Sequence, residues 1–211
     1  MDLLVVAATN FEITPFLATN TNADILITGI GIPATIFTLQ NKLLHKKYDL
    51  VIQAGIAGTF NDSFENSNVF FVKEDTFADI GAEENGEFQT LFEMGLANEN
   101  EFPYTNGWLK NDHPLIKQSY LATAKSVTVN KITGDKNQVE KLREKFGAGI
   151  ESMEGAAFHY VCLLQKVNFL QLRSISNIVG ERDKSKWKMK EAIEVLNNEL
   201  QKLVQKLNGA K

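Results

Sequence analysis

Three apolar stretches, each followed by a turn of small residues, constrain the fold of this chain more than any other feature. They cover residues 3–8, 24–33 and 49–58. Unbroken apolar runs of this length are typical of strands buried on both faces of a parallel sheet. Helical spacing of apolar residues follows at 34–46 and returns in the final part of the chain. This alternation predicts one α/β domain over residues 1–211 with a largely central sheet.

Length and charge exclude several classes of protein. A chain of 211 residues suits one sizeable core, and its net charge of -4 gives no sign of a basic nucleic-acid-binding face. The apolar start of the chain is short and reads as a strand rather than a signal peptide, and no stretch approaches the ~20 apolar residues of a membrane helix. The single cysteine, Cys162, excludes a disulfide framework and favours a reducing cytoplasm. Cys162 itself is expected to be a small buried hydrophobe.

Polar residues at the ends of expected strands are the candidate functional residues. Glu12 follows the first run, and Glu154 lies where an expected strand at 148–154 passes into a helix. Arg173 and Asn177 lie at the middle and the end of the last expected strand, 169–177. Ligands tend to bind at the carboxyl ends of strands in α/β sheets. The structural alternatives are a surface acid for Glu12, a favourable charge at a helix N-terminus for Glu154, and an edge position for Arg173.

Two glycine-containing turns carry weaker signals. The Gly29-x-Gly31 turn lacks the third glycine of a dinucleotide fingerprint, and the turn that begins at Gly55 and Ile56 lacks the lysine of a P-loop. No cofactor is therefore expected. The three histidines are far apart in sequence and no metal-binding spacing occurs, so we predict no metal.

Residues 81–114 form an aromatic-rich insertion with four glycines and two prolines. Phe92 and Trp108 belong to it. Long irregular segments in compact domains are usually binding segments or lids, so we expect a lid or pocket wall here. The alternative is a satellite hydrophobic cluster under a surface loop.

Five motifs together resemble the nucleoside phosphorylase/nucleosidase superfamily over nearly the whole chain. The motifs are ATNFE at 8–12, GIG at 29–31, QAGIAG at 53–58, ESMEGAA at 151–157 and RSISN at 173–177. The stretches 79–83, 106–109 and 179–187 are similar to its futalosine-cleaving branch in particular. The resemblance implies a phosphorylase/hydrolase-like three-layer sandwich with a mixed central sheet flanked by helices.

The resemblance also implies a reaction: hydrolysis of the N-glycosidic bond of futalosine, which releases hypoxanthine in a route to menaquinone. Such cleavage needs a base for water, donors for the purine and groups that hold the ribose. By similarity, Glu12 activates water, Glu154 binds the ribose hydroxyls and Met153 packs on the ribose. Arg173 orients Glu12 and the water, or neutralises the carboxylates, while Glu151 is expected to be structural.

Two residues depart from the pattern of adenine-specific nucleosidases. Asn177 replaces an aspartate that protonates the purine, and an amide that donates to N7 or O6 suits hypoxanthine. The amide oxygen could instead accept from an adenine amino group. Ile56 replaces a serine that helps to hold water, so the water is expected to be positioned differently.

The resemblance assigns the remaining contacts and leaves rival functions open. Val129 and Ile132 are expected to border the base, and Arg182, Lys184 and Lys186 are candidate cations for the carboxylate of futalosine. A homo-oligomer is expected. The rivals are a methylthioadenosine or adenosylhomocysteine nucleosidase, a phosphorylase, and a non-catalytic nucleoside-binding protein on the same fold. A phosphorylase would need a cationic phosphate pocket, and no arginine is near Gly29-x-Gly31 or Gly55 in sequence.

Overall fold

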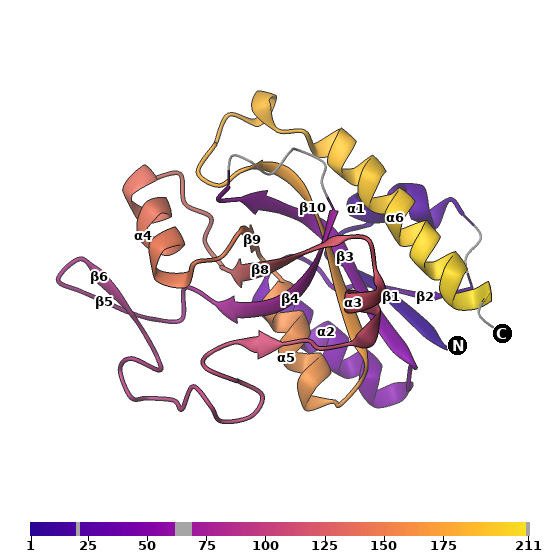
Figure 1. Cartoon of the computed structure of the whole chain (residues 1–211), viewed down its shortest axis with the longest axis horizontal. Helices are drawn as coiled ribbons and strands as arrows, with labels where there is room; N and C mark the ends of the chain where they lie inside the picture. Colours follow the sequence, from indigo (N-terminus) through magenta and orange to yellow (C-terminus); the bar gives the residue numbers. More distant parts are fainter. Residues whose placement is uncertain (20–21, 62–68, 210–211) are drawn as a thin grey trace.

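The computed structural model describes residues 1–19, 22–61 and 69–209, and strands and helices alternate along most of the chain (Figure 1). The strands are β1 (Leu3–Ala7), β2 (Asp24–Ile27), β3 (Leu50–Thr59), β4 (Val69–Phe77), β5 (Gly81–Glu84), β6 (Glu87–Thr90), β7 (Leu109–Lys110), β8 (Ala122–Thr128), β9 (Ile150–Ser152) and β10 (Phe169–Ile178). The helices are α1 (Asn10–Leu17), α2 (Ile32–His45), α3 (Pro114–Gln118), α4 (Lys136–Phe146), α5 (Gly155–Leu164), the 3₁₀ helix η1 (Lys184–Lys186) and α6 (Met189–Gly209). None of the helices in these ranges is long and apolar enough to cross a membrane.

The large sheet is mixed, and part of it closes on itself because β3 has three partners. Strand β3 pairs in parallel with β1 and β10, and antiparallel with β9. Strand β10 is antiparallel to β4, and β4, β8 and β9 follow in parallel pairings. The strands β3, β10, β4, β8 and β9 therefore form a closed ring of pairings, which β1 and β2 extend. The predicted mixed central sheet is confirmed, and the ring is a feature that the apolar runs did not indicate.

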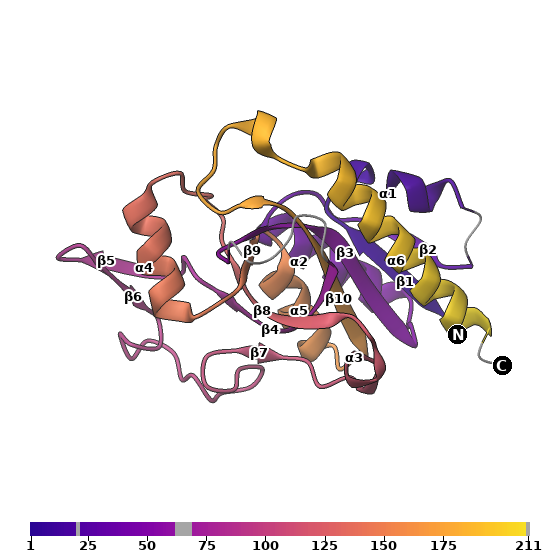
Figure 2. The same cartoon turned by 45° about the horizontal axis from the view of Figure 1, so that its top comes forward.

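Helices cover both faces of the parallel part of the sheet, as Figures 1 and 2 show. Successive residues of a strand point to opposite faces. Val5 accordingly packs in a core with Phe16 of α1 and Leu200 of α6, while its neighbour Leu4 packs with Phe158 of α5. Helix α2 lies on the same side as α5, and the two helices contact each other. These are the layers predicted from the sequence.

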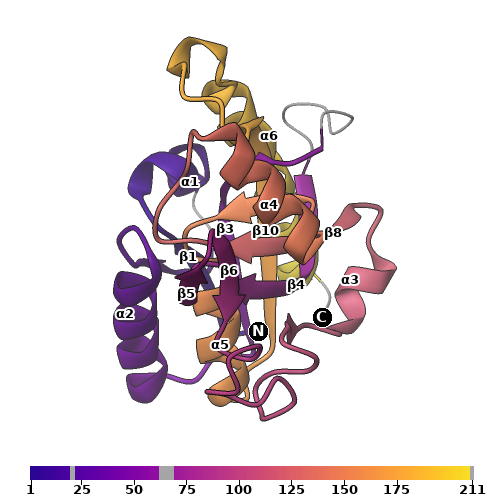
Figure 3. The ribbon, with the colours of Figure 1, turned by 90° about the vertical axis from the view of Figure 1, so that its left-hand side faces the viewer.

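The segment 81–114 is more regular than expected. It contains the β5–β6 hairpin, a series of turns and β7, which pairs with β4. Figures 1 and 3 show the hairpin projecting beyond the sheet at the end where α4 lies. Lys145 of α4 bonds to Glu93 at 2.7 Å, which ties the segment to that helix. A role as a lid stays a prediction.

Candidate active site

The carboxyl ends of β1, β3 and β10 meet at one edge of the sheet, because these three strands are parallel neighbours. Glu12, Gly55 and Arg173, which are far apart in sequence, converge at this edge. Each of the two carboxylates that the sequence predicted here, Glu12 and Glu154, is at most 7% exposed. Burial of charged groups at a strand edge needs specific partners, which the structure supplies.

Glu12 is held at the start of α1 by three donors. Its Oε2 accepts from the backbone N and the hydroxyl of Thr9, at 3.1 and 3.2 Å, which completes a capping box. Its Oε1 accepts from the backbone N of Ile56 in β3 at 3.2 Å. Burial raises the pKa of Glu12, the Arg173 charge opposes this, and Glu154 adds to the increase. The side chain is therefore fixed in place and its pKa is moved toward the range of a general base.

A buried asparagine in the last helix fixes the backbone of α1. Asn197 Nδ2 donates to the carbonyl of Glu12 at 2.8 Å, and Asn197 Oδ1 accepts from the backbone N of Phe16 at 2.9 Å. Asn197 is 2% exposed. Asn197 was not predicted from the sequence, although a lone asparagine within the apolar stripe of an amphipathic helix is a signal that indicates such a role.

Glu154 precedes α5 at the N-cap position without a side-chain capping bond, and its carboxylate instead bridges two distant parts of the chain. Its Oε1 accepts from the backbone N of Gly31 at 3.0 Å, and its Oε2 lies 3.7 Å from Arg173 Nη1. Gly31 has a φ of 89°, which is the left-handed region that favours glycine. The Gly29-x-Gly31 turn thus presents a backbone donor to a carboxylate of the chain itself.

Arg173 lies between the two carboxylates and is 1% exposed. Its Nη2 donates to Gln53 Oε1 at 3.0 Å and its Nη1 to the carbonyl of Ile56 at 3.3 Å. The turn expected at Gly55 and Ile56 is wrong, because both residues belong to strand β3. Gly55 is opposite Arg173 in the β3–β10 pairing, and a Cβ there would lie 2.4 Å from Nη1 and 3.0 Å from Glu12 Oε1. Only glycine leaves room for this approach. The expectation that no arginine lies near Gly55 holds along the sequence but is wrong in space.

Asn177 lies at the end of β10, just past an irregularity in the pairing with β3. Its Oδ1 accepts from the Ser176 hydroxyl at 2.8 Å, and its Nδ2 donates to the carbonyl of Ile178 at 2.9 Å. An amide nitrogen carries two hydrogens, so one remains for another acceptor. This arrangement orients the amide as a donor at the sheet edge.

The structure brings some of the other candidates to this edge and places others beyond it. Met153 and Ile56 are half-buried beside Glu154 and Gly55. Val129 is buried, and its backbone N donates to the carbonyl of Ser152, the residue before Met153, at 3.0 Å. Ile132, in contrast, is 39% exposed. Their contacts with a substrate stay predictions.

The aromatic candidates are engaged with other side chains. Trp108 has Lys125 Nζ 3.9 Å above its ring and Phe146 of α4 at its edge. Phe92 packs against Tyr104 with ring centroids 5.1 Å apart. Their proposed roles in binding the substrate stay predictions as well.

The candidate cations are partly engaged too. Arg182 lies near the Trp187 ring, at 6.0 Å from its centroid, and Lys186 bonds to Glu181 at 2.7 Å. In the described part of the chain, no group of three or more histidine, cysteine, aspartate or glutamate side chains could hold a metal ion.

A buried polar cluster behind the N-terminus of α5 was also missed. Asp75 is fully buried, and it accepts from the Thr128 hydroxyl at 2.9 Å and from Gln171 Nε2 at 3.3 Å. Burial raises the pKa of Asp75 to about 6. Thr128 Oγ1 in turn accepts from the backbone N of Ala156 at 2.7 Å. The cluster anchors the first turn of α5 and therefore the position of Glu154.

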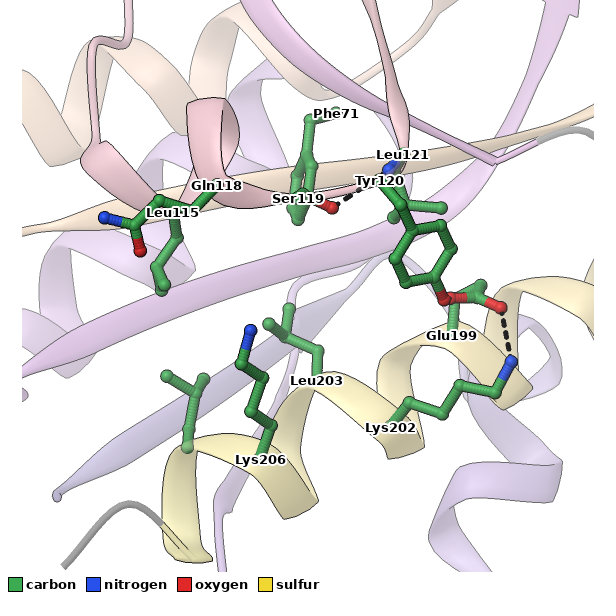
Figure 4. A pocket seen from close by; sticks show the side chains of 11 residues that line it. Phe71, Leu115, Gln118, Ser119, Tyr120, Leu121, Glu199, Lys202, Leu203 and Lys206 are labelled. Carbon is green, nitrogen blue, oxygen red and sulfur yellow. Dashed lines mark hydrogen bonds and ion pairs between the residues drawn. The ribbon is translucent and has the colours of Figure 1, made fainter.

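A separate groove between α3, the start of β8 and α6 has a different character (Figure 4). Leu115, Leu121 and Leu203 give it an apolar lining, and Tyr120 bonds to Glu199 at its side. None of the residues at the strand edge lines this groove. The candidate residues are therefore gathered at the sheet edge and not in this groove.

This chain, with its mixed sheet and its two buried carboxylates around one arginine, also matches a known protein family. The chain belongs to the phosphorylase superfamily, which it matches over residues 10–208. Two similar relatives are both futalosine hydrolases. The protein of Thermus thermophilus is 28% identical over 88% of this chain and 83% of the relative. That of Streptomyces coelicolor is 30% identical over 79% and 69%.

Solved structures share the fold. Futalosine hydrolase of Helicobacter pylori superposes with a TM-score of 0.80 at 17% identity, covering 98% of both chains. A mutant of the Helicobacter pylori 5'-methylthioadenosine nucleosidase, with 5'-methylthioadenosine in its active site, also gives 0.80 at 17% identity, covering 97% and 98%. The predicted superfamily fold and the similarity to futalosine hydrolases are both confirmed.

Proposed function

We propose that this protein is a hydrolase of N-glycosyl bonds that cleaves futalosine with water, releasing hypoxanthine and dehypoxanthine futalosine. The observation that carries the proposal is the convergence of Glu12, Glu154 and Arg173 around Gly55 at the sheet edge. Two relatives that match most of the chain are futalosine hydrolases. A protein that only binds nucleosides has no need of a buried base held by three donors.

Glu12 is the proposed base that removes a proton from the attacking water. The burial that raises the pKa of Glu12 also strengthens it as a base, whereas the Arg173 charge lowers that pKa and favours the ionised form that can accept a proton. The three donors on its oxygens fix its direction, so little reorganisation is needed during the reaction.

Glu154 and Met153 are the proposed ribose-binding residues. The Gly31 backbone holds one oxygen of Glu154, and the Arg173 guanidinium lies near the other. When both carboxylates are ionised, Glu12, Glu154 and Arg173 carry a net negative charge. That charge stabilises the cationic character that the sugar develops as the bond breaks.

Asn177 is the proposed donor to the departing purine. Its amide oxygen faces the Ser176 hydroxyl, and its nitrogen keeps one hydrogen free of the bond to Ile178. A donor at this place suits N7 or O6 of hypoxanthine. This orientation supports a 6-oxopurine over the adenine of a methylthioadenosine nucleosidase.

Water is the proposed nucleophile rather than phosphate. Arg173 lies beside Gly55 of β3, and its Nη1 and Nη2 are engaged by the Ile56 carbonyl, Glu154 and Gln53, whereas its buried Nε has no partner among the described residues. A guanidinium committed to these acceptors is not a free phosphate pocket.

The deciding assay measures hypoxanthine release from futalosine, with and without added phosphate. We expect release in both conditions at the same rate. Methylthioadenosine is the matched competitor substrate. Adenine release from it with futalosine left intact would contradict the proposal, and a rate that depends on phosphate would identify a phosphorylase instead.

A homo-oligomer, a cytoplasmic location and a place in menaquinone synthesis complete the proposal. Phe37 and Leu44 lie seven residues apart on α2 and are 75% and 67% exposed, and Ile30, beside the Gly29-x-Gly31 turn, is 62% exposed. An apolar stripe of this kind supports an interface with a second copy. The lone, buried cysteine supports a reducing compartment.

A further inference from the structure

The polar cluster behind the N-terminus of α5 contains three fully buried side chains that the proposed reaction does not use. They are Asp75 of β4, Gln171 of β10 and His159 of α5. Asp75 and Gln171 also pack closely against the start of α5, because a Cβ on Gly155 would overlap both Asp75 Oδ2 and Gln171 Nε2. Gly155 directly follows Glu154 in sequence, so the state of this cluster bears on the position of that carboxylate.

Two hydrogen-bond acceptors in the cluster have no donor among the described residues. They are Gln171 Oε1 and His159 Nε2. The other ring nitrogen of His159, Nδ1, lies 2.9 Å from the carbonyl of Leu109. A carbonyl can only accept, so Nδ1 carries the hydrogen and Nε2 is left to face the Gln171 side chain, which raises the pKa of the imidazole. Buried acceptors without donors are costly, and here two of them face each other.

One proton on Asp75 and a half-turn of the Gln171 amide give each of these atoms a partner. The half-turn exchanges the amide oxygen and nitrogen and moves no other atom. The Gln171 oxygen then occupies the 3.3 Å contact with Asp75 Oδ2, where two oxygens can bond only if Asp75 carries a hydrogen. The Gln171 nitrogen donates to His159 Nε2. The Thr128 hydroxyl continues to donate to Asp75 Oδ1.

The strands beside Asp75 present hydroxyl and apolar groups to it. Strand β8 contributes two hydroxyl groups, and β7 contributes Leu109, the direct partner of Asp75 in the antiparallel pairing. Glu74, the residue before Asp75 on β4, points to the opposite face, where it lies 3.4 Å from Lys125. These neighbours therefore supply no cation that would hold Asp75 in its ionised form.

The charge that acts on the cluster comes from Arg173, which follows Gln171 on the same face of β10. The Arg173 charge lowers the pKa of both Asp75 and His159. Burial is the larger influence on each group, so the pKa of Asp75 is raised to about 6 and that of His159 is lowered to about 4. Both groups therefore favour their neutral forms. The half-turn of Gln171 removes a donor from Asp75 and favours its neutral form further.

We propose that Asp75 is protonated in the folded protein and that Asp75, Gln171 and His159 form a neutral relay of hydrogen bonds. The relay fixes the first turn of α5 and thereby positions Glu154. It also leaves the Arg173 charge to the two carboxylates of the site, because an ionised Asp75 would compete for that charge. Asp75 is thus a positioning residue for the reaction, a role that rests on the proposed function, whereas its protonation does not.

The pH dependence of stability tests the proton. Asp75→Asn supplies the same acceptor and donor but does not titrate. Folding raises the pKa of Asp75 above its ordinary 3.8, so the unfolded chain releases this proton first as the pH rises. Wild-type stability should therefore fall relative to Asp75→Asn from about pH 4 through about pH 6 and above. The measurement is the Tm of Asp75→Asn minus that of the wild type, which should increase with pH.

Asp112→Asn is the matched control, because Asp112 is an exposed acid. Its Tm difference from the wild type should show no such increase. A Tm difference for Asp75→Asn that is flat, or that falls as the pH rises, would show that Asp75 is ionised in the folded protein and would overturn the inference.

Infrared spectroscopy in D₂O detects the proton and the relay directly. The wild-type spectrum minus that of Asp75→Asn should contain the carbonyl band of a protonated carboxyl at pH 6, and the band should disappear at higher pH. His159→Phe keeps a ring against Phe169, whose centroid is 4.7 Å from that of His159, but removes the acceptor. The Gln171 nitrogen then turns to Asp75, so the band should disappear at a lower pH than in the wild type.

Two infrared results would overturn the inference. One is the absence of the band from the wild type at pH 6, and the other is an identical titration of the band in His159→Phe. If His159→Phe does not fold, the wild-type band and the Tm difference decide.

Rescue by the conservative variant tests the positioning role. Asp75→Ala removes the relay, and we expect kcat/KM for futalosine to fall by up to about 100-fold because Glu154 is displaced. Asp75→Asn should keep most of the wild-type value. An equal loss in both variants would mean that the reaction needs a charge at Asp75, and would overturn the inference. If Asp75→Ala does not fold, the tests of the proton on Asp75→Asn decide. Absence of futalosine cleavage by the wild type would contradict the proposed function alone, because the Tm and infrared tests need no substrate.

Discussion

At the residue scale, Glu12 combines a structural role with the chemical role proposed for it. Its capping box with Thr9 is a local feature of a helix N-terminus. Its bond from the Ile56 backbone is a long-range contact that joins α1 to β3. The same carboxylate therefore positions the helix and faces the site.

Glu12→Gln should fold and bind substrate but lose turnover. An amide cannot take a proton from water, so we expect kcat to fall by roughly 10²- to 10⁴-fold. Because the pKa of Glu12 is raised, wild-type activity should be lost as the pH falls through a value above the ordinary 4.5 of a glutamate. This limb should be missing from the pH–rate profile of the variant. Initial rates across pH measure both effects. An unchanged rate in Glu12→Gln would show that Glu12 is not the general base.

At the element scale, the pairing of β3 with β10 creates the site. Gly55 and Arg173 are opposite each other in this parallel pair, so the guanidinium lies directly over the glycine and reaches the carboxylates on either side. The polar cluster around Asp75 fixes α5 against the other side of the ring. Each acid is thus placed by a different element, and the arginine connects them.

Gly55→Ala should damage activity more than stability. The new Cβ would overlap Arg173 Nη1 at 2.4 Å, and the guanidinium must move. Overpacking of this kind costs about 1–3 kcal/mol of folding free energy, whereas displacement of Arg173 disturbs both carboxylates. Gly209→Ala is the control, since a Cβ there meets nothing within 4 Å. Measurements of Tm and kcat/KM on both variants test this, and wild-type kcat/KM in Gly55→Ala would mean that Arg173 needs no fixed position.

At the scale of the whole molecule, the site and the proposed interface are adjacent. The exposed stripe on α2 begins next to the turn whose Gly31 backbone binds Glu154. A second copy seated on this stripe would therefore lie beside the end of the site where we propose that ribose binds. Association and catalysis are expected to be linked for that reason.

Phe37→Glu should convert the oligomer to a monomer. The side chain is 75% exposed in the single chain, so a charge there disturbs no core contact and opposes only an apolar interface. Light scattering coupled to gel filtration measures the mass, and kcat/KM measures the link to the site. Lys47→Glu, at an exposed position beyond α2, controls for added charge. If the mass of the variant equals that of the wild type, either the interface lies elsewhere or the wild type is itself a monomer.

Local patterns were enough to predict the main strands and helices and to select candidates for the site, but not the short elements β5, β6, β7 and α3. The apolar runs predicted β1, β2 and β3, and the resemblance of five motifs predicted the superfamily, which is confirmed. Strand ends in an α/β sheet share an edge, so Glu12, Glu154 and Arg173 could be expected near one another. A prediction of this kind needs only spacing and residue type.

The sequence by itself determined most strands of the large sheet and the helices that cover it, because hydrophobic periodicity is a local property. It did not indicate the β5–β6 hairpin, β7 or α3. Only the tertiary structure decided which acid has which neighbours. Glu154 accepts from Gly31, which is 123 positions away, whereas Oε2 of Glu151, in the same strand–helix junction, accepts from none of the described residues. The sheet also closes through the pairing of β3 with β9. Such closure depends on pairing between distant strands, which no short pattern encodes.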